Sequence, residues 1–481
     1  MAYTTIDKPW TYFRTKTYTG NAGSQSITFD ETDVNMQPDW TWIKKRNGAA
    51  DSSVMDSVRG VRQSLTTNNN EDDYTESAGL SAWNSNGFSF DGSGFDHVNT
   101  SNTFVAWNWL AGGTAPSQTY TVTVVDDSGN KYRFDGFGTS AVTLDLQEGG
   151  TYTFDASDSS VSSHPFVIGT SANSNEYSTG VTYQLDGVSK TYSEYTSGFS
   201  SASSRKLIIT VAASAPTLYY WCSVHSGMGG QINTNTLHGS SNFAGSVQTR
   251  VSASTTAGFS IVKYPGNNNG TTTTIGHGLG GVPELYIVKS LDSAGNWQSY
   301  HHKLASDPET DYIQLDENGA RADYTFWGDT APTSTVFTVK DGNDVNESGE
   351  NFIAYCFRGI KGYSKYGSYT GNDGNNFIYT GFKPAFLICK RADSSDNWKI
   401  LDNKRGATDP EGNPKNYTLM SDLANTEGAP EGGIDVYFHS NGFFFDGMTN
   451  DAYNHSGGEY IYIAIAEQPL VGSNDIPATA K

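Results

Sequence analysis

Apolar and polar residues alternate in short runs along most of the chain, and Gly, Ser, Asn or Asp residues separate these runs. Alternation with a period of two is typical of β-strands, and the small polar residues favour tight turns. No long stretch places apolar residues at helical spacing. The pattern therefore predicts an all-β, multi-domain protein whose helices are few and short.

An internal repeat organises this pattern. The string YTGN occurs at Tyr18–Asn21 and at Tyr369–Asn372, and the variant YPGN occurs at Tyr264–Asn267. Each string is followed, 15 to 20 residues later, by a proline that opens a near-continuous apolar run. These prolines are Pro38, Pro283 and Pro384. Proline is tolerated where a strand begins, and an unbroken apolar run predicts a strand that is buried on both faces.

The first and third copies share two further strings. Asp56–Gly60 matches Asp402–Gly406, and Asn86–Gly92 matches Asn441–Gly447. Asn-Gly followed by alternating Phe predicts a hairpin whose second strand has one apolar face. The Asp and Arg of the first string have no third group beside them in sequence, so a local ion pair that fixes a loop is favoured over a catalytic pair. The second copy lacks both strings.

Each copy is therefore predicted to be a small β-sandwich or β-barrel module. The modules span residues 18–111, 264–360 and 369–470. Residues 1–17 are interpreted as an N-terminal anchor segment, 236–263 as a linker and 471–481 as a C-terminal tail. Small modules can hide their strand edges by three-fold packing, which predicts a homo-oligomer, with a trimer expected.

Residues 115–235 interrupt the repeat with a different pattern. Short strands with strict alternation follow one another, separated by Gly- and Ser-rich loops. Examples are Tyr120–Val124, Val142–Leu146 and Leu207–Val211. This spacing predicts a Greek-key sandwich inserted between the first and second modules.

The inserted domain carries a candidate metal site. Cys222, His225 and Met228 form a Cys-x-x-His-x-x-Met loop, and His164 lies upstream, before Pro165. A thiolate, two imidazoles and a weak thioether are the ligands of a type 1 copper centre. The order and spacing resemble cupredoxins, with the short loop most similar to amicyanin. The resemblance implies that His164, Cys222 and His225 are equatorial ligands and Met228 the axial one; the alternative is a cupredoxin-like fold that binds no copper.

Composition narrows the classes of function. The formal net charge of −21 disfavours binding to nucleic-acid phosphates and to anionic membranes. The N-terminus shows no signal peptide, and no run of apolar residues is long enough to cross a bilayer. Cys356 and Cys389 sit in apolar runs and are interpreted as buried thiols, whereas His301 and His302 are interpreted as a surface pair.

Several strings resemble tail fibres and related structural proteins of marine and cyanobacterial bacteriophages. They are the repeats themselves, the segment AGSVQTRVSASTTAGFSIVKYPGN and the C-terminal YIYIAIAEQPLVGSNDIPATAK. The resemblance implies a virion component, expected at the tail, that contacts other tail or capsid proteins and a host cell-surface glycan or protein. It brings no catalytic residues with it, so we expect a non-enzymatic protein.

Three alternatives remain open from the sequence. The chain could be a capsid-attached decoration or fibre protein, or a soluble type 1 copper protein that transfers electrons. A carbohydrate-degrading enzyme is the third, because the many acidic residues are scattered and a pair of catalytic carboxylates leaves no sequence motif.

Overall fold

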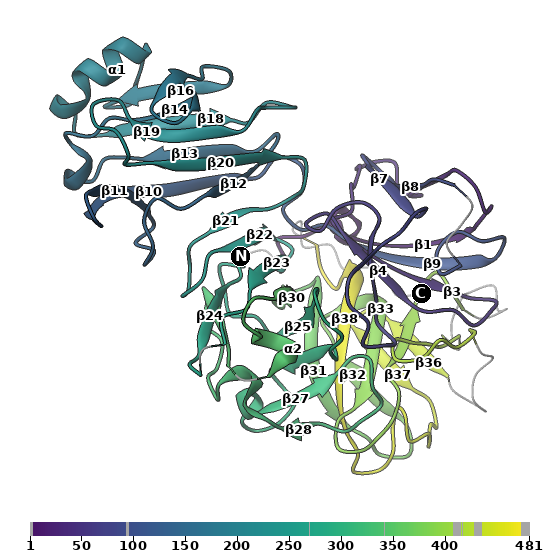
Figure 1. The fold of residues 1–481 in the computed structure, drawn as a ribbon. Helices are drawn as coiled ribbons and strands as arrows, with labels where there is room; N and C mark the ends of the chain where they lie inside the picture. Colours follow the sequence, from purple (N-terminus) through teal and green to yellow (C-terminus); the bar gives the residue numbers. More distant parts are fainter. Residues whose placement is uncertain are drawn as a thin grey trace. The chain divides into compact units, whose positions relative to one another are not determined.

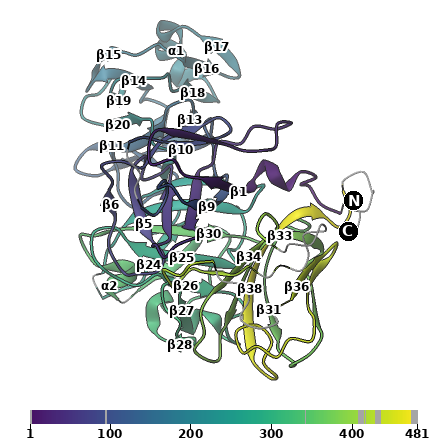
Figure 2. The same ribbon diagram turned by 90° about the vertical axis from the view of Figure 1, so that its right-hand side faces the viewer.

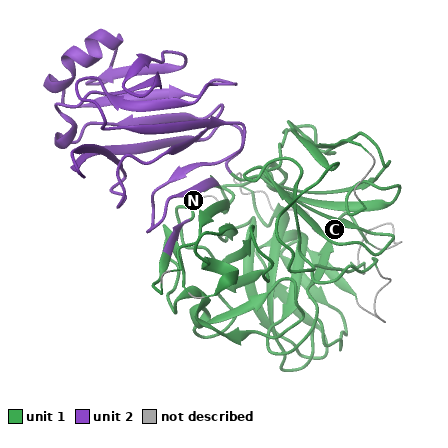
Figure 3. Cartoon of the chain, viewed as in Figure 1, with its two compact units in different colours: residues 1–111, 253–273, 277–481 green, residues 112–252, 274–276 purple. Residues whose placement is uncertain are grey.

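A computed structural model of the chain describes residues 3–92, 96–268, 270–340, 342–406, 415, 417–427 and 435–472. It divides into two compact units, shown in Figure 3. Unit 1 comprises residues 1–111, 253–273 and 277–481, and unit 2 comprises residues 112–252 and 274–276. The α-helices found in the described residues are α1 (Tyr192–Gly198) and α2 (Asn343–Asn346), so the predicted all-β fold with short helices is confirmed.

Module 1 is a sandwich of a large and a small antiparallel sheet (Figure 1). The large sheet has the order β1 (Phe13–Thr19), β9 (Thr103–Trp109), β3 (Trp40–Lys45), β4 (Ser53–Asp56), β5 (Gln63–Thr66) and β6 (Tyr74–Thr75). The small sheet has the order β2 (Gln25–Thr28), β8 (Gly87–Phe90) and β7 (Leu80–Asn84). The hairpin predicted from Asn86-Gly87 is the β7–β8 turn, where Gly87 adopts a φ of 130°.

Module 3 repeats this arrangement. Its large sheet has the order β31 (Ser364–Thr370), β38 (Glu459–Pro469), β33 (Phe382–Arg391), β34 (Lys399–Asp402) and β35 (Leu419–Met420). Its small sheet has the order β32 (Asn376–Tyr379), β37 (Gly442–Phe445) and β36 (Val436–His439). Strand by strand, β31 to β35 correspond to β1 to β5, and β36, β37 and β38 correspond to β7, β8 and β9.

Module 2 builds the same large sheet, in the order β23 (Phe259–Pro265), β30 (Asn351–Phe357), β25 (Leu285–Ser290), β26 (Gln298–His301), β27 (Asp311–Gln314) and β28 (Ala322–Asp323). The strands from β30 to β28 are labelled in Figure 2. A further strand of this module is β29 (Val336–Val339), whereas β24 (Thr273–Gly276) begins in unit 1 and its residues 274–276 belong to unit 2. The first strands of the three modules begin at Phe13, Phe259 and Ser364, each five residues before the Tyr that marks the repeat. Residues 13–17 of the expected anchor segment are therefore part of β1.

The modules of unit 1 share one hydrophobic core, whereas the repeat suggested separate cores. One face of each large sheet packs under its own small sheet, and the other face joins a common cluster. This central cluster is rich in aromatics from all three modules, among them Phe13, Trp40, Trp107, Trp109, Phe259, Tyr355, Phe357, Tyr366 and Phe386. The Trp40 and Tyr355 rings lie 4.8 Å apart, and the Trp109 and Phe386 rings 5.5 Å. Strands β3 and β25 are buried along their whole length, so the predicted burial on both faces is confirmed for them.

Backbone hydrogen bonds link the modules in a ring. At equivalent positions, an amide of each module donates to a carbonyl of the next, from 1 to 2, from 2 to 3 and from 3 back to 1. These bonds are Asp73 N to Leu291 O (3.2 Å), Arg321 N to Ala392 O (2.8 Å) and Glu427 N to Arg46 O (2.8 Å). Two indoles donate in the opposite direction, from module 2 to 1 and from module 3 to 2: Trp297 Nε1 donates to Thr66 O, and Trp398 Nε1 donates to Gln314 O, each at 2.8 Å. Successive modules therefore meet through the same interface three times.

A buried lysine reinforces each of these interfaces. Lys44, Lys289 and Lys390 lie six residues after the three strand-opening prolines and are fully buried. Their ammonium groups donate to carbonyls of the neighbouring module: Lys44 to Leu423 O (2.6 Å), Lys289 to Asn70 O (3.3 Å) and Lys390 to Asn318 O (3.3 Å). Burial lowers the pKa of each lysine to about 8. A polar group at this depth needs its partner, so the lysines help to set the register between modules.

At a second position that is equivalent in the modules, module 2 has a carboxylate and module 1 has an amide. Asp316 Oδ1 accepts a hydrogen bond from Trp297 N at 3.0 Å, and in module 1 the Oδ1 of Asn68 accepts the same bond from Ser52 N at 2.7 Å. Burial raises the pKa of Asp316 to about 7, and the charge of Lys289 opposes this rise. Asp316 is therefore a buried group that titrates where module 1 places a neutral amide.

We predict that Asp316→Asn removes a pH-dependent loss of stability. Because the folded chain binds the Asp316 proton more tightly than the unfolded chain, wild-type stability falls as pH rises from about 4 toward about 7, and asparagine does not titrate. Denaturant unfolding should show the variant gaining about 4 kcal/mol over wild type between about pH 4 and pH 8, because each unit of pKa difference corresponds to about 1.4 kcal/mol. The reverse change, Asn68→Asp, should introduce the same dependence. A difference that stays constant with pH would contradict the assignment.

The matched Asp and Arg strings form buried ion pairs, as predicted. Arg59 Nε lies 2.5 Å from Asp56 Oδ2, and Arg405 Nε lies 2.7 Å from Asp402 Oδ2. Oδ1 of each Asp also accepts two backbone amides of its own loop, which include the amide of the paired Arg. Arg405 Nη1 continues to Glu427 Oε1 at 2.9 Å. The arginine therefore neutralises two carboxylates where no water reaches its side chain.

We expect Arg405→Met to destabilise unit 1 by about 3–5 kcal/mol, because it leaves Asp402 buried without its counter-charge and Glu427 paired with Arg46 alone. Chemical denaturation followed by tryptophan fluorescence measures this cost. Lys8→Met, which breaks the exposed pair with Asp33 at 2.8 Å, is the matched control and should cost less than about 1 kcal/mol. Equal effects of the two substitutions would show that the buried pair adds no more than a surface one.

Unit 2 is a two-sheet sandwich. One sheet has the order β11 (Asn130–Phe134), β10 (Ser117–Asp126), β13 (Thr151–Asp155), β18 (Arg205–Thr210), β16 (Val181–Leu185) and β17 (Val188–Lys190). The other has the order β12 (Leu144–Gln147), β20 (Gly230–Asn235), β19 (Leu218–Cys222), β14 (Phe166–Ser171) and β15 (Ser174–Glu176). An aromatic core of its own fills the space between the sheets.

The edges of unit 2 extend beyond the expected domain of 115–235. Residues 236–263, suggested as a linker, hold β21 (Ser240–Asn242) and β22 (Thr249–Ser254), and Phe243 packs into the core of unit 2. Of the expected C-terminal tail, residues 473–481 lie outside the described residues.

Candidate metal site

Strand pairing in unit 2 brings the predicted ligands His164 and Cys222 to one end of the sandwich. Cys222 is the last residue of β19 and pairs with Phe166, the first residue of β14, in antiparallel register. His164 stands two residues before Phe166, and its carbonyl accepts a hydrogen bond from the Tyr132 hydroxyl at 2.8 Å. His225 follows in the loop after β19, so one imidazole comes from each side of the cysteine.

Three of the four predicted ligands lie within coordinating reach of one another. The Nδ1 atoms of His164 and His225 are 3.0 Å apart, and Cys222 Sγ lies 3.9 Å from the first and 3.7 Å from the second. A metal bound by nitrogen at about 2.0 Å and sulfur at about 2.3 Å places the nitrogens roughly 3.3–3.5 Å and the nitrogen and sulfur roughly 3.5–3.7 Å from each other. The cluster therefore fits a metal ion after movements of a few tenths of an ångström.

Met228 lies in the same loop as His225, between β19 and β20, and is buried. The loop is held against β11: Tyr132 N donates to Met228 O at 3.0 Å, and Lys131 donates to Gly227 O. At Gly229 a Cβ atom would lie 1.7 Å from Tyr220 O, so the backbone approach requires glycine. The loop is thus fixed in place, and the role of Met228 as an axial ligand stays a prediction.

The electrostatics of the cluster favour the ligand form of histidine. Burial, followed by the nearby charge of His225, lowers the pKa of His164. A neutral imidazole offers the lone pair that a metal needs. His164 and Cys222 are buried while His225 is exposed, so one imidazole of the cluster reaches the surface. Val224 beside it is 65% exposed.

Other residues singled out by sequence lie in unit 1. Cys356 and Cys389 are buried thiols, as predicted, and burial raises the pKa of both, that of Cys389 to about 12. The expectation of a surface His301–His302 pair is wrong for His301, which is fully buried and whose pKa falls to about 3 through burial. His301 Nε2 lies 3.4 Å from Tyr462 O, because module 3 covers the end of β26.

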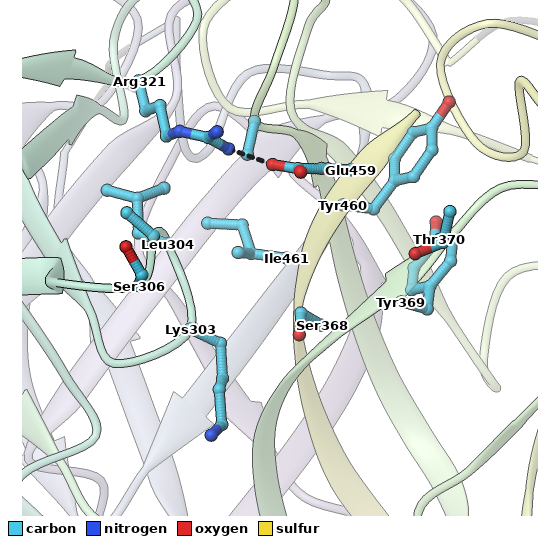
Figure 4. A pocket seen from close by; sticks show the side chains of 12 residues that line it. Lys303, Leu304, Ser306, Arg321, Ser368, Tyr369, Thr370, Glu459, Tyr460 and Ile461 are labelled. Carbon is cyan, nitrogen blue, oxygen red and sulfur yellow. Dashed lines mark hydrogen bonds and ion pairs between the residues drawn. The ribbon is translucent and has the colours of Figure 1, made fainter. Parts of the chain in front are cut away.

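Two cavities of unit 1 were not anticipated. One, of about 530 Å³, is crossed by the ion pair of Arg321 and Glu459, with Lys303 on its wall (Figure 4). The other, of about 680 Å³, shares Lys303 and also exposes Lys361 and Lys365. Their lining residues are far apart in sequence and come from modules 2 and 3 and, at Tyr3, from the N-terminal segment, so no motif could have revealed them.

Comparison with known proteins adds one finding. No curated protein and no solved structure matches the chain. In the described parts of the chain, no helix has the length and apolarity needed to span a membrane. A family model described as a domain of unknown function, DUF7483, matches residues 8–143 and 231–469. The gap between the matched segments, residues 144–230, holds His164, Cys222, His225 and Met228. The chain therefore belongs to the DUF7483 family, with the candidate metal ligands in a segment that the family model does not cover.

Proposed function

We propose that the chain is a non-enzymatic structural protein of a bacteriophage particle, a tail fibre or tail-associated fibre that adheres to the host surface. The observation that carries the proposal is the ring of three modules around one aromatic core. In such a ring the contacts between modules make the structure rigid, and the loops and outer sheet faces stay available for display. The resemblance of the repeats and of the C-terminal segment to phage tail-fibre proteins supports the same function.

The expected location is testable on purified particles. Mass spectrometry should find the chain at a fixed ratio to the major capsid protein, and a cryo-EM reconstruction should show density for two β-units at the tail. Density on the capsid shell would instead favour the alternative, a capsid-attached decoration protein. Absence from purified particles, with the chain present in the infected cell, would reject a structural role.

The oligomeric state of the chain is tested in solution as well as in the reconstruction. A homotrimer is the proposed oligomer, and sedimentation equilibrium of the purified full chain should report three times the mass of the monomer. A monomer at all concentrations would show that the internal ring already supplies the three-fold packing.

A second candidate function concerns unit 2. The approach of His164, Cys222 and His225 supports a copper-binding site, and with the buried Met228 the donor set is that of a type 1 centre. Copper bound there would tie β14 to the β19–β20 loop and so stabilise one end of the sandwich. A soluble electron-transfer protein is the alternative use of the same site.

We predict that the full chain loaded with Cu(II) turns blue, with an absorption band near ~600 nm from the thiolate bond to copper. Cys222→Ser should abolish the band and lower the unfolding temperature of the copper-loaded protein to that of the copper-free protein. Cys389→Ser is the control, because that thiol is buried away from the site, and its band should persist. A colourless protein that gains no thermal stability with copper would rule out the site.

A further inference from the structure

The small sheet of module 3 presents an aromatic outer face. Along β32, β37 and β36, alternate residues fill the module core, and the others point outward. The outward residues are Phe377, Tyr379, Phe444, Tyr437 and His439. Phe377 is 45% exposed and Tyr379 49% exposed, values high for large apolar rings.

These rings form one continuous surface. The imidazole of His439 lies 6.3 Å from the Phe377 ring, 6.3 Å from the Tyr437 ring and 6.0 Å from the Phe444 ring. The His439 and Tyr437 rings are nearly parallel, at 13°. A contiguous aromatic patch of this kind marks an interaction surface more often than chance exposure of single side chains does.

Module 1 shows that the fold does not require the aromatics. The strand registers place Ser26 where module 3 has Phe377, and Thr28 where it has Tyr379. The other three counterparts are Ser89 for Phe444, Ala82 for Tyr437 and Asn84 for His439. In module 1 this face is polar: the hydroxyls of Ser26 and Ser89 lie 2.9 Å apart, and Asn84 Nδ2 donates to Ser89 Oγ at 2.7 Å. The same sheet is thus stable with small polar residues, so the aromatics of module 3 serve another purpose.

A cluster of cations adjoins the aromatic face. Tyr379 also lines the cavity of about 680 Å³, together with Tyr3, Lys361 and Lys365. Lys361 Nζ lies 4.5 Å from the centroid of the Tyr3 ring, and Lys365 Nζ lies 5.5 Å from that of Tyr379 and donates to its carbonyl at 2.7 Å. Lys303 is a third ammonium group in the lining.

The charge of this cavity contrasts with that of the chain. Its one carboxylate is that of Glu284, which lies 3.6 Å from His302 Nε2, so three lysines face a single acid. The chain as a whole carries a net charge of −21. A local excess of positive charge lets an acidic protein attract an anionic ligand at this one place.

We infer that this surface binds an anionic polysaccharide, with sugar rings stacked on Phe377 and Tyr379 and their carboxylate or sulfate groups paired with Lys361 and Lys365. Pyranose rings present flat faces of C–H groups that pack on aromatic rings, and lysines pair with the acidic substituents. Single-stranded nucleic acid also stacks on aromatics and carries a charge on every nucleotide, but the adhesive function proposed for the chain favours a host-surface glycan. The inference rests on the proposed adhesive function and names the class of its ligand.

The test measures binding of the full chain to polygalacturonate, alginate and a sulfated glycan, with neutral dextran and a deoxythymidine oligonucleotide for comparison. We expect at least one of the acidic glycans to bind and dextran and the oligonucleotide not to bind. The double substitution Phe377→Ser and Tyr379→Thr introduces the residues of module 1 and should weaken glycan binding by at least ~10-fold without changing the unfolding temperature. Lys361→Ala with Lys365→Ala should weaken binding similarly and reduce its salt dependence.

The matched control is Ser26→Ala with Thr28→Ala on the equivalent face of module 1, which should leave binding unchanged. The inference is overturned if no acidic glycan binds, if the module 3 substitutions leave affinity unchanged, or if the oligonucleotide binds more tightly than the glycans. These outcomes are separate from the location of the chain. A chain found in particles that binds no glycan overturns only this inference, and a chain that binds glycan but is missing from particles overturns only the structural role.

Discussion

Burial of the large sheets on both faces is the constraint on which the rest of unit 1 depends. One face of each sheet needs its own small sheet, and the other needs the corresponding faces of two further modules. A single module would expose an aromatic face that includes Trp40 or Phe386 to water, and the cost in transfer free energy would be large. The polar groups that lie between the modules, such as Lys289 and Arg405, are consequently paired with carbonyls or carboxylates of fixed position, because an unpaired polar group at that depth is expensive.

Much of this architecture could be predicted from the sequence, and the remainder could not for identifiable reasons. The unbroken apolar run after Pro283 correctly indicated a strand buried on both faces, but such a run does not say what covers each face. The shared core therefore escaped prediction, as did the burial of His301 under module 3. The predicted module boundaries were placed at the repeated Tyr, because the five residues before it differ between copies. In the structure those five residues form the start of each first strand. The repeated lysines could have been recognised in the sequence, because Lys44, Lys289 and Lys390 each lie six residues after a strand-opening proline.

The candidate metal site follows different rules. Sequence spacing identified His164, Cys222 and His225, and the register of β14 against β19 explains why residues so far apart meet. The family match stops before these residues and resumes after them. The assignment of the chain to its family therefore does not depend on the metal ligands. Any chemistry at the metal site in unit 2 is separable from the display role proposed for the modules. The position of the Met228 sulfur depends on the conformation of a short loop, which spacing alone does not specify.

A ring closed within one chain has a consequence that a ring of identical subunits lacks. In a homotrimer, a substitution on an outer sheet face appears three times, and each appearance must be compatible with folding and with solubility. In a covalent ring the three copies diverge independently while their inner faces stay matched. Module 1 and module 3 show this divergence on the same sheet, which carries Ser26 and Ser89 in one and Phe377 and Phe444 in the other. An aggregation-prone aromatic face is thereby limited to one per ring. If the chains assemble further, each ring contributes the aromatic face of its module 3 in a defined direction.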